Sequence, residues 1–214
     1  MPRIVVINPN SDAAMTRMID LRLNHLRRRD GPELICLTLE QGPLAIETAD
    51  DVRQVIAPLC DLAAGLHAPD AIVIGCFSDP GLVELRARTD CLVLGFCEAA
   101  VATAIGLGGH YGIITNLDTD IPDERAYLAA GNLDGRLAGI EAIGVPVRAL
   151  TTCPDVPQRM MAAVGRLREQ GAASIILGCA GFSGYATELG QATGMRIIDP
   201  SIAATAMAIA TTSL

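Results

Sequence analysis

The sequence predicts an α/β protein of two similar lobes, each built on a parallel sheet flanked by helices. Short apolar runs rich in β-branched residues alternate with helical patterns along all 214 residues. The two halves also repeat one order of motifs, which indicates lobes related by a pseudo-twofold axis with an active site between them. We expect lobe 1 to comprise residues 1–97 and 201–214, and lobe 2 to comprise residues 98–200.

Eight short apolar runs between turn residues are expected to be strands. They are residues 4–8, 33–39, 71–76, 91–96, 111–115, 145–150, 174–179 and 196–199. Ser11 or Asp12 should cap the first helix, and Thr48 with Asp51 resembles a capping box at the start of the second. Pro58 should kink or interrupt that second helix, because it lacks an N–H and clashes with the preceding turn.

Two Gly-Cys pairs follow matching strands in the two halves. Gly75-Cys76 follows the third predicted strand, and Gly178-Cys179 follows the seventh. Ligand crevices form at the carboxyl ends of parallel strands, and a thiolate is stabilised where it faces a helix N-terminus. One thiol from each half could therefore remove a proton from one face of a small molecule and return one to the other face.

Polar or small residues stand beside both pairs, at the same edge of each predicted sheet. Asn8 ends the first strand, and Thr115 and Asn116 end the fifth. We expect these side chains, with the backbone N–H groups that follow each Cys, to hold the substrate and stabilise an oxyanion. The predicted substrate-binding residues are Asn8, Phe77, Ser78, Thr115, Asn116, Ala180 and Gly181.

Other residues near the Gly-Cys pairs have simpler interpretations. Asp79 is expected to cap the helix that begins near Pro80, and Glu98 to be an acidic residue of a first helical turn, although it could contact the substrate. Cys97 follows a strand end and could also reach the pocket. Four further cysteines are expected to be small buried hydrophobic residues: Cys36, Cys60, Cys91 and Cys153.

Composition excludes several classes of protein. The net charge of −8 argues against a nucleic-acid surface, and the lack of Trp argues against a stacking platform for bases or flavins. All 16 basic residues are Arg, so pyridoxal-phosphate chemistry and a Walker-type phosphate loop lack their Lys. We therefore expect no cofactor. A metal site is not expected either, because His25, His67 and His110 have no ligand spacing and no Cys-x-x-Cys motif occurs.

The cysteine count and the apolar segments indicate the compartment and the partners. Seven Cys with no recognisable secretion signal favour a reducing cytoplasm, and no apolar run reaches transmembrane length. The expected partner is a small-molecule substrate, with neither nucleic acid nor membrane. The segment 202–210 is apolar nearly all round, so we expect it to be buried against other elements or against a second subunit.

Several motifs together resemble the aspartate/glutamate/hydantoin racemase superfamily, and most closely its hydantoin and allantoin racemase branch. The segments that carry the resemblance are 6–11, 42–47, 75–82, 98–100, 142–147 and 177–181. The resemblance implies a cofactor-independent, two-lobed enzyme, often oligomeric, in which Cys76 and Cys179 are the catalytic acid and base. Phe96-Cys97, Phe182 and Asp199-Pro200-Ser201 depart from the branch's pattern.

Three functional hypotheses remain open at the level of sequence. The first is racemisation of a 5-substituted hydantoin, allantoin or a similar cyclic imide. The second is another reaction of the superfamily: aspartate or glutamate racemisation, maleate-type cis–trans isomerisation, or malonate-type decarboxylation. The third is a binding protein without catalytic activity. A decarboxylase needs one Cys and a binding protein needs neither, so the pair favours racemisation or isomerisation.

Overall fold

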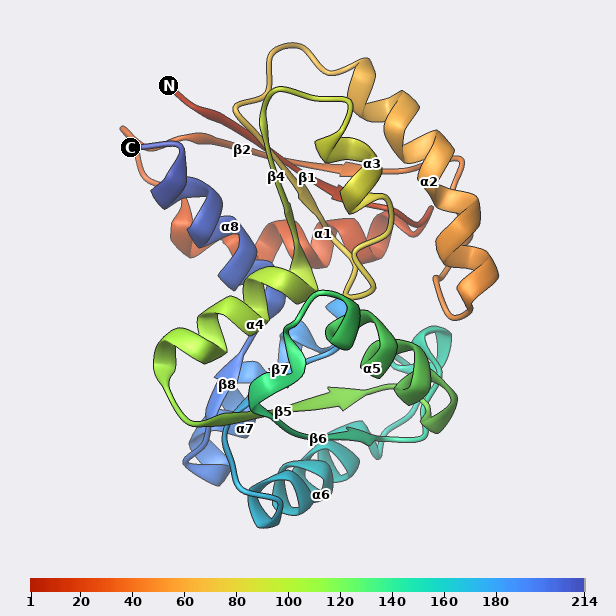
Figure 1. Cartoon of the computed structure of the whole chain (residues 1–214), viewed down its shortest axis with the longest axis vertical. Helices are drawn as coiled ribbons and strands as arrows, with labels where there is room; N and C mark the ends of the chain where they lie inside the picture. The colour runs from red at the N-terminus through yellow and green to blue at the C-terminus, as the bar shows by residue number, and fades with distance from the viewer. Residues whose placement is uncertain (214) are drawn as a thin grey trace. The chain divides into compact units, whose positions relative to one another are not determined.

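The computed structural model describes residues 1–213, and the chain divides into two compact units (Figure 1). The first unit contains Met1–Ala99 and Ser201–Leu214, and the second contains Ala100–Pro200. Each unit holds one parallel sheet of four strands with helices packed against it. The predicted α/β class with two parallel sheets is therefore confirmed.

The first unit is built on a sheet in the order β2-β1-β3-β4. Its strands are β1 (Arg3–Asn8), β2 (Glu33–Thr38), β3 (Ala71–Ile74) and β4 (Leu92–Gly95). The central strands β1 and β3 are buried on both faces, which explains why they are continuous apolar runs rather than alternating ones. Since all four strands are parallel, their carboxyl ends lie at one edge of the sheet.

Helices cover both faces of this sheet. α1 (Ala13–Arg22) packs against β1 and β2, whereas α2 (Ala49–Ala64) and α3 (Leu82–Arg86) share a core with β1 and β3 on the other face (Figure 1). Asp12 caps α1 by accepting from the Ala14 N–H over 2.8 Å, and Thr48 with Asp51 forms the predicted capping box. The interruption expected at Pro58 is wrong, because α2 continues through it.

Two helices join the units along the chain. α4 (Phe96–Leu107) follows β4 directly, and α8 (Pro200–Thr211) follows the last strand. Along α8, Ala204 and Ala208 are buried while Ala206 and Ala210 are exposed. The burial expected for this helix therefore holds for one of its faces.

The second unit repeats the same topology, with strand order β6-β5-β7-β8. Its strands are β5 (His110–Thr115), β6 (Leu137–Ala142), β7 (Ala172–Leu177) and β8 (Arg196–Ile198). The strand predicted at 145–150 is wrong: residues 147–149 form a 3-10 turn, and the edge strand lies earlier, at β6. Gly144 is left-handed and Pro146 has no N–H to donate, so this apolar stretch leaves the sheet.

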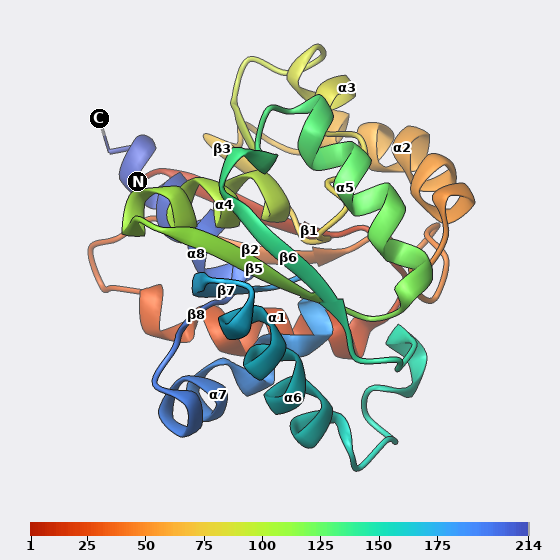
Figure 2. The ribbon, with the colours of Figure 1, turned by 60° about the horizontal axis from the view of Figure 1, so that its bottom comes forward.

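Helices α5 (Ile121–Ala130) and α6 (Val156–Glu169) lie on opposite faces of β5 and β6 (Figure 2). α7 (Ala186–Thr193) packs beside α6 and β8. The main core of this unit lies between α6 and the sheet and includes Ile114, Met160 and Ile175. No helix within residues 1–213 is long and apolar enough to cross a membrane.

Candidate functional site

The two Gly-Cys pairs leave their sheets through the same backbone arrangement. The Gly75 N–H donates to the Ile7 carbonyl over 2.8 Å, and the Gly178 N–H donates to the Ile114 carbonyl over 2.8 Å. A Cβ atom would lie 3.0 Å from the carbonyl oxygen at Gly75 and 2.7 Å from it at Gly178. Glycine is therefore needed at both positions for the neighbouring strand to approach, and each Cys stands one residue beyond this contact.

Cys76 is partly buried, and its Sγ lies 3.3 Å from the Ser78 hydroxyl oxygen. Burial raises the pKa of this thiol. The Ser78 hydroxyl and the N–H groups of Ser78 and Phe77 lower the pKa, while the Asp79 carboxylate raises it again, and burial exceeds these effects. Cys76 therefore keeps its proton at neutral pH in this structure.

The helix expected directly after Cys76 begins later. α3 starts at Leu82, has five residues, and is preceded by Gly81 in the left-handed conformation with φ 74°. No helix N-terminus therefore follows Cys76 directly in the chain. The groups that favour its thiolate are the hydroxyl and N–H donors of the turn that follows it.

Asp79 caps a different helix from the one predicted. Its two carboxylate oxygens accept from the Cys97 N–H over 2.9 Å and from the Glu98 N–H over 3.0 Å, at the start of α4. The prediction that Asp79 caps the helix after Pro80 is wrong, because its side chain reaches the next strand's end instead. A Cβ atom at Gly95 would lie 2.2 Å from the Asp79 carboxyl carbon, so this contact requires glycine there. The turn that carries Cys76 is thereby tied to α4.

Glu98 and Cys97 both lie in the first turn of α4. Glu98 is the acidic residue of that turn, as predicted, and its carboxylate accepts from Arg86 Nη2 over 2.8 Å. Cys97 is buried, with 2% of its surface exposed. The N–H groups of both residues are bonded to Asp79, so this helix end is already occupied by a carboxylate.

The Asn8 amide is engaged within the turn between β1 and α1. Its Nδ2 donates to Asn10 Oδ1 over 2.7 Å and to Thr16 Oγ1 over 3.0 Å. Thr16 in turn bonds Thr38 at the end of β2 over 2.6 Å. These bonds fix the ends of two adjacent strands, and they use the amide hydrogens that we expected to face an oxyanion.

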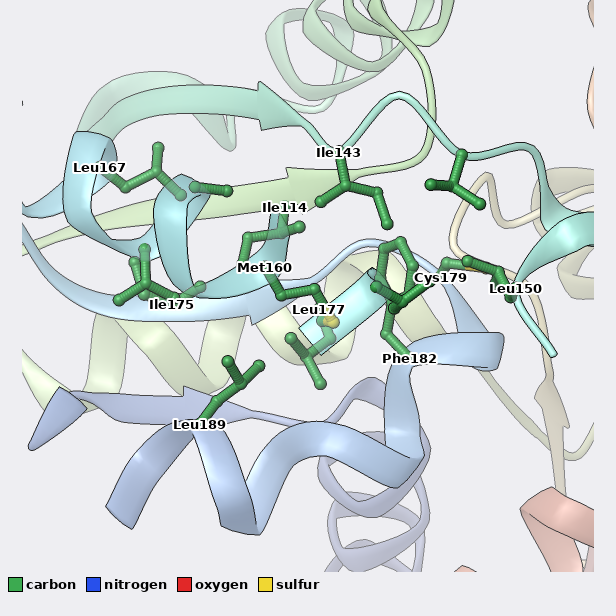
Figure 3. Close-up of a cluster of buried hydrophobic side chains, with 14 of the residues drawn as sticks. Ile114, Ile143, Leu150, Met160, Leu167, Ile175, Leu177, Cys179, Phe182 and Leu189 are labelled. Carbon is green, nitrogen blue, oxygen red and sulfur yellow. The ribbon is translucent and has the colours of Figure 1, made fainter. Parts of the chain in front are cut away.

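Cys179 lies at the end of β7, at the N-cap of a 3-10 helix that spans Ala180–Tyr185. It is 9% exposed and packs in the core cluster with Leu150 and Phe182 (Figure 3). A Cβ atom at Gly181 would lie 2.5 Å from Leu150 Cδ1 and 3.5 Å from the Cys179 sulfur. A side chain at Gly181 would therefore clash with Leu150, whereas its contact with the thiol would be an ordinary one.

Thr115 and Asn116 lie at the end of β5, beside Gly178. The Asn116 amide donates to the Val145 carbonyl over 2.9 Å and so holds the segment that follows β6. The Thr115 hydroxyl donates to Glu124 Oε1 over 2.5 Å. Burial raises the pKa of Glu124 to about 8; the Thr115 hydrogen bond lowers it, and the Asp120 carboxylate raises it.

The sequence did not indicate Glu124 as part of the site. It stands in Pro122-Asp123-Glu124-Arg125, which is typical of a solvated first helical turn. In the structure the preceding residue, Asp123, is indeed exposed, but Glu124 is turned toward the strand end. Its spacing of nine residues after Thr115 was the only available signal, and that spacing alone carries little information.

The remaining cysteines divide into one buried residue and three that are partly buried. Cys60 is buried, as predicted. Cys36, Cys91 and Cys153 are only partly buried, so the prediction of full burial is wrong for these three. Cys91 and Cys153 pack against the edges of the two cores. Burial and the neighbouring Asp20 raise the pKa of Cys36 to about 12, which leaves it an unreactive thiol.

Each unit therefore gathers its own half of the predicted site residues at the carboxyl edge of its sheet. Asn8, Cys76, Phe77 and Ser78 lie together at the ends of β1 and β3. Thr115, Asn116, Cys179, Ala180 and Gly181 lie together at the ends of β5 and β7. Within residues 1–213, no three His, Cys, Asp or Glu side chains are grouped as metal ligands would be.

The chain is similar in sequence and in fold to known proteins. A family model described as Asp/Glu/Hydantoin racemase matches residues 4–208. A hydantoin racemase of Rhizobium meliloti is 33% identical over 96% of this chain and 86% of its own length. The structure of an allantoin racemase from Klebsiella pneumoniae superimposes with a TM-score of 0.92 at 28% identity, covering 100% of this chain and 88% of that one. An allantoin racemase from Pseudomonas fluorescens gives a TM-score of 0.89 at 28% identity, over 99% and 91% of the two chains.

Proposed function

Because the chain belongs to the Asp/Glu/Hydantoin racemase family, we propose that it racemises a 5-substituted hydantoin, allantoin or a similar small cyclic imide. Relatives named hydantoin racemase and allantoin racemase support this substrate class. The observation that carries the proposal is the matched pair of Gly-Cys strand ends, each with the same 2.8 Å backbone contact. In this proposal Cys76 and Cys179 are the acid/base pair.

Proton transfer between the two faces of one carbon requires one thiolate and one thiol. The thiolate removes the proton from the stereogenic carbon beside a carbonyl, and the opposite thiol delivers a proton to the other face. The roles reverse for the other enantiomer. Because burial raises the pKa of Cys76, this residue is suited to deliver the proton, and its thiolate must be stabilised when the roles reverse.

The intermediate of this reaction is a planar enolate-like anion, which needs hydrogen-bond donors at the developing oxyanion. The candidate donors are the backbone N–H groups of Phe77, Ser78, Ala180 and Gly181. Ala180 and Gly181 follow Cys179 directly and open the 3-10 helix that it caps, which supports this role. The Ser78 hydroxyl contacts Cys76 and lowers its pKa, so it stabilises the Cys76 thiolate once the proton has left.

The experiment is a substrate panel in D₂O, with single enantiomers of 5-substituted hydantoins, allantoin, aspartate and glutamate. NMR follows deuterium at the stereogenic carbon, and polarimetry follows loss of optical rotation. The proposal predicts both signals for a cyclic imide. If only aspartate or glutamate takes up deuterium and racemises, the substrate is an amino acid and the cyclic-imide assignment is wrong. If no compound of the panel exchanges, the proposal is contradicted.

A further inference from the structure

The carboxyl of Glu124 has no task in the proton transfers proposed above, yet it is held beside the site. Its Oε1 accepts a short hydrogen bond from the Thr115 hydroxyl, over 2.5 Å. Its Oε2 is buried and has no hydrogen-bond partner among the described residues. A buried carboxyl oxygen without a donor costs free energy, so this group calls for a physical explanation.

The equivalent position in the first unit uses a neutral group instead. Ile7 and Ile114 make the same bond to the glycine of each pair, so Asn8 and Thr115 end equivalent strands. The helix after Asn8 offers it the Thr16 hydroxyl, whereas the helix after Thr115 offers the Glu124 carboxyl. The first unit shows that a neutral partner is sufficient for this topology, so the carboxyl is not required by the fold.

We propose that Glu124 is a positioning residue that turns the Thr115 hydroxyl into an acceptor for an N–H group of the substrate. A hydroxyl carries one proton and two lone pairs. Since the proton of Thr115 is directed to Glu124, only the lone pairs remain for a ligand. The inference rests on the proposed function, because cyclic imides and ureides carry ring N–H groups next to the reacting carbon or its carbonyl.

The electrostatics of Glu124 are consistent with this assignment. Burial raises its pKa to about 8, Thr115 is the hydrogen-bonding group that lowers it, and Asp120 repels its negative charge. A substrate N–H bonded to Thr115 would add a positive dipole beside the carboxyl, opposite in effect to burial and to Asp120. The second unit would then recognise a donor on the substrate, while the Asn8 amide of the first unit is engaged in its own turn.

The inference has a consequence for substrate specificity. A site built to bond a substrate N–H rejects an analogue that lacks it, because its own polar groups are then left unpaired. Methylation of the recognised ring nitrogen should therefore lower kcat/KM by about 10²-fold or more. Methylation of the other ring nitrogen should have a smaller effect.

The test compares the parent substrate with its two N-methyl derivatives in the wild type, Glu124→Leu, Glu124→Gln and Asp123→Asn. In Glu124→Leu the hydroxyl of Thr115 is free to rotate, so the preference for the parent over one N-methyl derivative should fall at least about tenfold, mainly through KM. Glu124→Gln keeps an oxygen acceptor and should retain the preference. Asp123→Asn, at the exposed neighbouring position, should match the wild type.

Thr115→Val provides a second route if Glu124→Leu does not fold, since it removes the acceptor itself and should abolish the same preference. The inference is overturned if Glu124→Leu or Thr115→Val keeps the wild-type ratio of kcat/KM values, or if the ratio falls equally in Asp123→Asn. A wild type that racemises no compound of the panel contradicts the proposed function, and the inference fails with it. A wild type that is active but insensitive to N-methylation contradicts the inference alone.

Discussion

The raised pKa of Glu124 predicts a measurable pH dependence of stability. The folded protein holds a proton on Glu124 up to about pH 8, whereas the unfolded chain loses it near the ordinary value of 4.5. Between these limits the folded state binds more protons than the unfolded state, so stability falls as pH rises, by about 1.4 kcal/mol per pH unit. Between pH 4.5 and about pH 8 the free energy of unfolding therefore falls by about 5 kcal/mol, whereas below pH 4.5 this group causes no loss of stability.

Glu124→Gln removes this titration and keeps an oxygen that can accept the Thr115 proton. The free energy of unfolding of the variant, minus that of the wild type, should therefore rise steadily between pH 5 and pH 8 and level off above it. Urea unfolding at fixed protein concentration, in steps of half a pH unit, measures this difference. Asp123→Asn serves as the control and should show no such slope. A difference that stays constant with pH would refute the claim that Glu124 is buried and protonated in the folded protein.

Three further predictions concern α4 and the turn that carries Cys76. Asp79→Ala should lower the free energy of unfolding by about 1–3 kcal/mol, as seen in urea unfolding, because two N–H groups at the start of α4 lose their acceptor. Gly95→Ala should destabilise the protein, because the added Cβ would clash with Asp79. Gly106→Ala should stabilise it by about 0.5–1 kcal/mol, because a Cβ at this position of α4 meets open space and alanine favours the helix. Thermal unfolding of the two variants tests both predictions. Iodoacetamide should alkylate Cys76 more slowly than a free cysteine at pH 8, because burial raises the pKa of this thiol. Ser78→Ala should slow the alkylation further, since the hydroxyl lowers that pKa, and mass spectrometry of the modified peptide measures both rates. Faster alkylation in Ser78→Ala would contradict the role assigned to the hydroxyl.

The central strands of the two sheets were predicted correctly, and they share one physical feature. β1, β3 and β7 are central strands, buried on both faces, so their sequences are uninterrupted apolar runs. The edge strand β6 has the sequence Leu-Ala-Gly-Ile-Glu-Ala and is only partly buried, so its signal is weak. The apolar run at 145–150 predicts a strand instead, although Pro146 argues against a strand interior.

The caps show a similar limit. The cap of α2 was predictable because Thr48 and Asp51 bond within four residues of chain. Asp79 caps a helix that begins 17 residues later, and no local pattern carries such a contact. The Thr115–Glu124 bond was hidden for the same reason, since burial of Glu124 depends on how α5 packs on its sheet.

The most direct test of the two-thiol mechanism follows each face of the substrate separately. Each variant, Cys76→Ser or Cys179→Ser, is incubated separately in D₂O with each pure enantiomer of the substrate that the panel identifies. NMR records deuterium exchange, and polarimetry records racemisation. The mechanism predicts that both variants lose racemisation. Each should still exchange deuterium with the one enantiomer whose proton faces its remaining Cys, so the two variants should act on different enantiomers. Cys60→Ser, at a core cysteine, should exchange and racemise both enantiomers. Racemisation at the wild-type rate in either Cys76→Ser or Cys179→Ser would contradict the account.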